Sequence, residues 1–334
     1  MQVRAVASDD EYAVTEGLAA DFESGVGAQL HERLVERARL SRNWLEQWWE
    51  DMAYLSTRTP LVPNSHMGGT FALFEDALTF EGGRSLWAAR NVSYYLEFWL
   101  LLRQERLKPQ SFRKIPWTMH QFRRFFNTTR VPQEGKDVIV NKFLTEAEES
   151  YAGESPTNLV VLQSGRVFTF DLLNGRQEPL TSAEIATQLD RIEDVCAQMG
   201  PGAGVGALTA GDRDSWAQNR RLLQELHPDN VRSLALVEDA MFVLVMDDAS
   251  PCNRQEVLIE SLKGDCTNRW IDKSYSFIVF KNLTLGSSAD CDNLSVVCDV
   301  FTGYGKGFMK PVRIHPEAYL QLAIQMGYHM LHGK

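Results

Sequence analysis

Cysteine is scarce in this sequence, and its spacing suits neither a metal site nor a disulfide framework. The five cysteines are Cys196, Cys252, Cys266, Cys291 and Cys298. No two of them form a CxxC pair, which zinc sites commonly use, and their number is odd, whereas disulfide scaffolds use even numbers. The pattern therefore predicts a reducing compartment and no bound metal.

Long hydrophobic runs and excess positive charge are also lacking. The most apolar stretch, SYYLEFWLLL at 93–102, contains Glu97 and is half the length of a membrane-spanning helix. The first residues, MQVRAVASDDEYAVTEG, carry acids where a signal peptide needs an apolar run. The net charge of −10 argues against a nucleic-acid partner or an anionic membrane surface. These absences predict a chain without a transmembrane segment, and leave room only for a local basic patch that binds a small anion.

Helical and strand patterns both run through the 334 residues, which are enough for two subdomains. Residues 28–55 place apolar side chains at helical spacing, from Leu30 to Met52 and including Trp44, Trp48 and Trp49, which predicts one amphipathic helix whose tryptophans pack in the core. Residues 158–172 predict a hairpin turning at Ser164-Gly165.

The remaining patterns predict an α/β fold with a mixed β-sheet flanked by helices. A capping box, TSAE, precedes a helix after Thr181, and a second polar-faced helix follows around 215–226. The apolar runs at 240–248 and 275–280 have the length and composition of buried central strands. The final helix, from Pro316, is predicted to turn Leu320, Ala323, Ile324 and Tyr328 inward.

Six stretches lie in order and cover nearly the whole chain. They are SRNWLEQWWEDMAYLSTRTPL (41–61), MHQFRRFFNTTRVP (119–132), NLVVLQSGRVFTFDL (158–172), ALTAGDRDSWAQNR (207–220), NRWIDKSYSFIVFKN (268–282) and FTGYGKGFMK with the helix after it (301–332). Together they resemble the choline/carnitine acyltransferase family, and most closely its peroxisomal, medium-chain members. The resemblance implies a chloramphenicol-acetyltransferase-like fold. Residues 1–290 would form the N-terminal acyltransferase part, and 291–334 would begin a second, incomplete domain.

The family's catalytic base has no counterpart at the expected place. In the family a histidine shortly after the strand equivalent to 275–280 deprotonates the carnitine hydroxyl, which attacks the thioester of acyl-coenzyme A. Here Gly286 is followed by SSADCDNLS, so Asp290 matches the acidic neighbour and Cys291 falls at the histidine position. From Asp292 onward the sequence resembles a helix and strand far downstream in the family. The resemblance therefore predicts a missing block rather than a substitution, and assigns no catalytic residue.

Other nucleophiles and bases in the sequence do not replace that histidine. Cys291 lies between Asp290 and Asp292, two carboxylates that would raise the pKa of a thiol, so we interpret it as a structural cysteine. His120, which precedes FRRFF, is interpreted as structural, and His227, which precedes Pro228, as a turn residue.

One stretch near the C-terminus retains the family's coenzyme-binding pattern. Lys306 and Lys310 are four residues apart in GYGKGFMK, on a predicted loop, and Arg313 follows, as phosphate recognition requires. The resemblance extends the site to His315 and Glu317, where the family more often has serine and aspartate. A solvated basic loop is the alternative interpretation.

Two functions remain open. The first is carnitine O-acyltransferase activity on a medium-chain acyl group, with acyl-CoA and carnitine as substrates, no permanently bound cofactor and a peroxisomal location by resemblance. The second is a non-catalytic truncated isoform that binds acyl-CoA or a protein partner, with a cytoplasmic location if the short chain is real. Whether the chain as written is an enzyme is left undecided, because the general base is absent.

Overall fold

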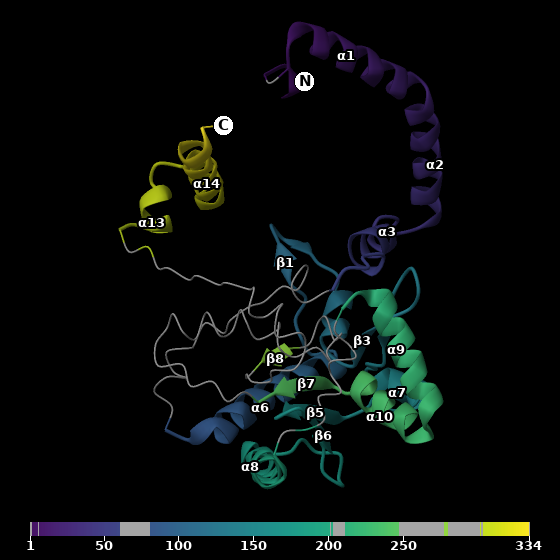
Figure 1. Ribbon diagram of the computed structural model, residues 1–334, viewed down its shortest axis with the longest axis vertical. Coiled ribbons are helices and arrows are strands. Elements are labelled where there is room, and N and C mark those ends of the chain that lie inside the picture. Colours follow the sequence, from purple (N-terminus) through teal and green to yellow (C-terminus); the bar gives the residue numbers. More distant parts are fainter. Residues whose placement is uncertain are drawn as a thin grey trace.

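The computed structural model describes residues 2–5, 7–60, 81–200, 202, 211–246, 277–279, 301 and 303–333 (Figure 1). The helices are η1 (Gln2–Ala5), α1 (Asp9–Ser24), α2 (Val26–Leu40), α3 (Glu46–Glu50), η2 (Asp51–Leu55), α6 (Gly83–Arg103), η3 (His120–Phe125), α7 (Glu146–Ala152), α8 (Ser182–Met199), α9 (Arg213–Leu226), α10 (Pro228–Asp239), α13 (Lys306–Met309) and α14 (Pro316–His332). The strands are β1 (Ser111–Phe112), β2 (Ile115–Pro116), β3 (Thr128–Val131), β4 (Val138–Asn141), β5 (Asn158–Gln163), β6 (Arg166–Asp171), β7 (Phe242–Val245) and β8 (Phe277–Val279). Apolar strands form a four-stranded sheet, with α6 and α8 near one side of it and α9 and α10 near its end, while α1, α2, α13 and α14 lie away from it.

The predicted mixed sheet is confirmed, with strand order β6-β5-β7-β8. β5 and β6 form the predicted antiparallel hairpin, which turns at Ser164-Gly165 with both residues at positive φ. β5, β7 and β8 are parallel neighbours. Two smaller antiparallel pairs, β1-β2 and β3-β4, lie outside this sheet.

Both faces of β5 and β7 are buried, which explains their continuous apolar sequences. Leu159 and Leu244 belong to the larger core cluster, which α6 and α8 complete. Val160 and Val243 belong to a second cluster on the other face, against which Val237 of α10 packs. α8 begins at the predicted capping box, where the Thr181 hydroxyl accepts from the Glu184 N–H.

The single helix predicted for 28–55 is wrong. α2 ends at Leu40, and residues 41–45 separate it from α3, which continues as the π-helical turn η2. Ser41 and Asn43 cause the break, because the Ser41 hydroxyl donates to the Asn43 carbonyl and the Asn43 side chain accepts from the Glu46 N–H. The predicted core packing of the tryptophans is also wrong for two of them, since Trp48 and Trp49 are exposed.

The last helix begins at Pro316 as predicted, but its packing was predicted wrongly. No residue of α14 is buried, and Leu320, Ile324 and Tyr328 are exposed rather than turned inward. In the part of the chain that the structure describes, no helix is long and apolar enough to cross a membrane.

Candidate functional site

The sequence-predicted coenzyme site falls on α13, α14 and the turn between them, all within the described residues. Lys306 opens α13, which corrects the predicted loop to a short helix. Lys310 ends it, donating its N–H to the Lys306 carbonyl at 3.1 Å. The Arg313 N–H donates to the Lys310 carbonyl at 3.0 Å, and Arg313 itself has a left-handed φ of 59°. The backbone therefore gathers the three cations at one turn.

His315 and Glu317 lie at the beginning of α14. His315 is the N-cap residue, and its carbonyl accepts from the Tyr319 N–H at 3.0 Å. Glu317 lies in the first turn, where its carboxylate complements the helix dipole and accepts from the Gln321 side-chain amide at 3.0 Å. Both side chains are exposed, so this part of the predicted site is a surface rather than a cavity.

Aromatic side chains hold the basic turn against α14. The Tyr304 ring packs on Phe301, Phe308 and Tyr319 with centroid separations of 4.9, 5.3 and 5.9 Å. The Tyr304 and Tyr319 hydroxyls share a hydrogen bond, which raises the pKa of Tyr304. Among the described residues, no carboxylate pairs with Lys306, Lys310 or Arg313, so their charge is available to an anion.

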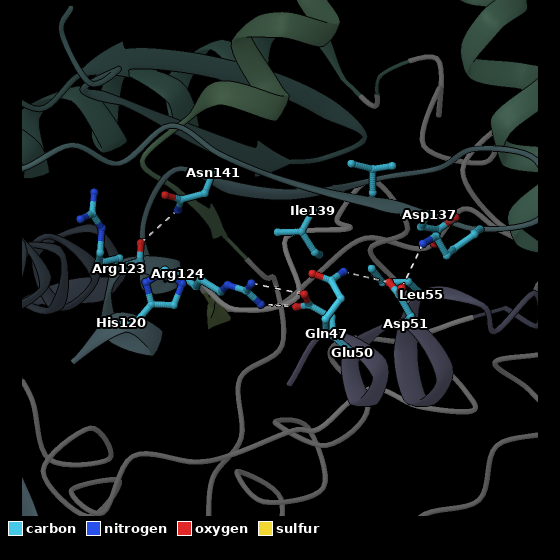
Figure 2. Close-up of a pocket in the computed structure, with 12 residues that line it drawn as sticks. Gln47, Glu50, Asp51, Leu55, His120, Arg123, Arg124, Asp137, Ile139 and Asn141 are labelled. Carbon is cyan, nitrogen blue, oxygen red and sulfur yellow. Dashed lines mark hydrogen bonds and ion pairs between the residues drawn. The ribbon is translucent and has the colours of Figure 1, made fainter. Parts of the chain in front are cut away.

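A separate pocket, which the sequence did not predict, lies between α3-η2, η3 and β4. Its volume is about 340 Å³, and its lining mixes both signs of charge (Figure 2). It is lined by Gln47, Glu50, Asp51, Leu55, His120, Arg123, Arg124, Lys136, Asp137, Val138, Ile139 and Asn141.

The cations of this pocket are held by acidic partners. Arg124 forms an ion pair with Glu50 (Figure 2). Lys136 Nζ lies 3.2 Å from Asp51 Oδ2. His120 lines the pocket from an exposed position, and within the described ranges no side chain bonds to its imidazole. Among the described residues, His120 thus has no side-chain partner that would orient its ring, and it keeps its structural interpretation.

One of the lining residues, Asp137, has a fully buried carboxylate that meets three arginines. Its Oδ1 lies 2.6 Å from Arg58 Nη2, and its Oδ2 lies 2.6 Å from Arg130 Nε and 2.7 Å from Arg213 Nε. Burial lowers the pKa of Arg58, but the ion pairs with Asp137 and Asp214 outweigh burial, so the net shift is upward. Arg58 follows η2, Arg130 lies on β3 and Arg213 begins α9, so Asp137 ties these three segments together beside the pocket.

The Arg123–Glu148 pair predicts a specific acid sensitivity. Hydrogen bonds from Arg123 and from the Thr145 N–H lower the pKa of Glu148 from 4.5 to about 2. A carboxylate whose pKa is lower in the folded state than in the unfolded state stabilises the fold at pH values above its unfolded-state pKa. That stabilisation is lost as the pH falls from 4.5 towards 2. We expect the urea midpoint to fall less between pH 5 and pH 3 for Glu148→Gln than for the parental chain. Glu154→Gln, at an exposed position, should keep the parental pH dependence, and an identical fall in all three proteins would contradict the prediction.

A family model matches the whole chain and shows which family it belongs to. The choline/carnitine O-acyltransferase model matches residues 1–291 and, as a second segment, residues 287–334. The chain belongs to the choline/carnitine O-acyltransferase family. Similar acyltransferases include the bovine peroxisomal carnitine O-octanoyltransferase, which is 32% identical over 99% of this chain. The human peroxisomal carnitine O-octanoyltransferase is 31% identical over 99% of the chain, and the human carnitine O-acetyltransferase 25% identical over 98%.

The chain spans 65% of the length of the bovine acyltransferase, 64% of the human octanoyltransferase and 62% of the human acetyltransferase. The bovine alignment extends over 407 positions against the 334 residues of the chain, a difference of 73. Gly286, Asp290 and Cys291, on which the missing-base prediction rests, lie outside the described residues.

The sequence carries one signal for the pocket. The stretch at 41–61 contains the acids Glu46, Glu50 and Asp51, whereas the stretch at 119–132 contains arginines and no acid, and Glu50 of the first pairs with Arg124 of the second. Only the fold shows that the two stretches, 74 residues apart at this pair, face one another.

Proposed function

We propose that the native protein transfers a medium-chain acyl group between coenzyme A and carnitine, and that the 334-residue chain is itself catalytically impaired. Family membership supports the reaction class, and the similarity to bovine and human carnitine O-octanoyltransferases supports the medium acyl chain. Acyl-CoA and carnitine act as substrates, with no permanently bound cofactor. The relatives' names also support a peroxisomal location, and a cytoplasmic one is proposed only for the short chain.

The observation that carries the proposed impairment is the division of the family match at 287–291. A match in two segments is expected when a chain joins two parts of the family that are normally separated. The 73 surplus alignment positions support the same interpretation, because they require gaps in this chain. The sequence contains no histidine between His227 and His315, the interval in which the family's general base would lie. We also propose that residues 1–290 form the N-terminal acyltransferase part and that residues 291–334 begin a second, incomplete domain.

The proposal predicts that the purified chain does not catalyse acyl transfer from acyl-CoA to carnitine at a significant rate. Loss of a general base costs on the order of 10²–10⁴ in rate. We expect carnitine-dependent release of coenzyme A from octanoyl-CoA to stay below one hundredth of the rate of bovine carnitine O-octanoyltransferase, assayed in parallel. A rate comparable to that control would overturn the impairment.

An intact-mass measurement on the native protein, captured with antibodies against residues 28–55, tests the reaction class. A mass well above 37.9 kDa with carnitine-dependent turnover would support the acyltransferase. A larger native protein that lacked turnover with octanoyl-CoA, acetyl-CoA and palmitoyl-CoA would overturn it.

The second candidate, a non-catalytic chain that binds acyl-CoA, is favoured by Lys306, Lys310 and Arg313, which have no carboxylate partner among the described residues. Hydrogen bonds that involve charged groups each contribute about 1.5–3 kcal/mol, and exposure reduces this. We therefore expect Lys306→Ala combined with Lys310→Ala to weaken coenzyme A binding about tenfold or more in calorimetry. Lys108→Ala with Lys114→Ala, also at exposed positions, is the matched control and should bind normally. Equal binding by both double variants would contradict a coenzyme site at this turn.

A further inference from the structure

α14 is apolar around most of its circumference, yet the structure leaves it exposed. Its seventeen residues, PEAYLQLAIQMGYHMLH, include only one carboxylate, Glu317, and no lysine or arginine. Leu322, Met326 and Leu331 are exposed on it, as are Leu320 and Ile324. A helix without a polar face normally lies inside a protein, so α14 requires a covering surface.

α1 and α2 form a second arm without a buried residue. Exposed apolar side chains recur at every fourth position along it, which is a helical spacing. They are Val14, Leu18, Phe22, Val26 and Leu30. Because helices in proteins gain most of their stability from packing such a face, this arm also requires a partner.

The charges of α1 and of residues 301–316 are opposite. α1 carries six acids and no basic residue, and these acids are Asp9, Asp10, Glu11, Glu16, Asp21 and Glu23. Residues 301–316 carry Lys306, Lys310 and Arg313 and no acid. α1 thus combines exposed apolar side chains with a negative field, and residues 301–316 add a positive field beside the apolar α14, so these two fields attract. α2 carries arginines as well as glutamates, so the attraction comes from α1.

The position of the arms favours a contact within one chain. Figure 1 shows α1 and α14, close to the N and C labels, on the same side of the central sheet and beyond β1. Both project away from the body of the molecule, where no other described helix covers them.

We propose that the α1-α2 arm closes on the α13-α14 arm of the same chain. The stripe from Val14 to Leu30 would cover the apolar surface of α14, while the acids of α1 would face Lys306, Lys310 and Arg313. The contact would order two helices that are otherwise exposed. It would also place carboxylates on the turn proposed for coenzyme A, so that the coenzyme and α1 would compete. The closure itself rests on the exposed faces and charges and does not require coenzyme binding.

Hydrogen exchange measured by mass spectrometry on the full chain tests the closure. We expect amides in 9–24 and 316–332 to exchange more slowly than in the variant with Lys306→Glu and Lys310→Glu, by about tenfold. Lys108→Glu with Lys114→Glu is the matched control and should leave both helices protected. Amides of β5 and β7 report whether each variant remains folded.

A second variant keeps the test decisive if the first one fails to fold. Reversing charge on the other arm, with Glu16→Lys and Asp21→Lys, should deprotect α14 although it changes no residue there. Unprotected amides in α1 of the parental chain, or protection of α14 unaffected by either reversal, would overturn the proposal. Protection that rises with protein concentration would also overturn it, since that result indicates a second copy as the partner.

Discussion

Asp137→Asn is expected to destabilise the folded chain by about 3–5 kcal/mol, the usual cost of removing one partner from a buried ion-pair network. The side chain of Asp137 is fully buried and faces Arg58, Arg130 and Arg213. Without its charge, three guanidinium groups remain close together in a poorly solvated site, where Asp214 offsets only part of the charge of Arg58. Urea unfolding followed by tryptophan fluorescence measures the loss.

Glu134→Gln is the matched control for that measurement. Glu134 pairs with Arg221 at 2.6 Å, but the side chains are 60% and 59% exposed, so water screens the interaction. We expect the control to change the free energy of unfolding by less than about 1 kcal/mol. If the two variants had equal unfolding midpoints, Asp137 would not organise the walls of the pocket.

We expect Trp99→Ala to lower the free energy of unfolding by a similar amount, through the loss of core packing rather than of charge. Trp99 on α6 is only 1% exposed and belongs to the larger core cluster, and Arg103 lies 4.9 Å from its ring centroid. Its indole N–H has no hydrogen-bond partner among the described residues, so the substitution removes mainly packing. Truncation of a buried tryptophan to alanine costs about 3–5 kcal/mol.

Trp49→Ala provides the comparison, since Trp49 is 60% exposed. We expect it to shift the free energy of unfolding by no more than about 0.5 kcal/mol. Urea or thermal unfolding of the two variants measures the difference. A larger loss of unfolding free energy for Trp49→Ala than for Trp99→Ala would contradict the assigned core.

The parts of the fold that were predictable are those fixed by local chemistry. Ser164-Gly165 determines the turn between β5 and β6 by its positive φ angles, and the Thr181 capping box sets the beginning of α8. The strand composition of β7 follows from burial on both faces. The break between α2 and α3 was missed because Ser41 and Asn43 divert backbone hydrogen bonds within an otherwise helical apolar period.

For the candidate sites, too, the sequence predicted the local part and not the part that depends on distant segments. Lys306, Lys310 and Arg313 are close in sequence, so the sequence predicted that one basic loop carries them, although the structure forms a short helix there. The pocket depends on contacts between distant segments, such as Arg124 with Glu50, and no local pattern specifies that pairing. Exposure of α14 could not be predicted either, because its apolar sequence is typical of a buried helix.

The parallel pairing of β5 with β7 has a consequence for synthesis on the ribosome. Leu162 of β5 pairs in register with Val245 of β7, so about 80 residues must be added before this edge of β5 is covered. At 5–20 residues per second this takes about 4–16 s, while the β5-β6 hairpin forms early from local contacts. During that interval the nascent chain presents an apolar strand edge, which makes it a natural client for chaperones that hold unpaired strands.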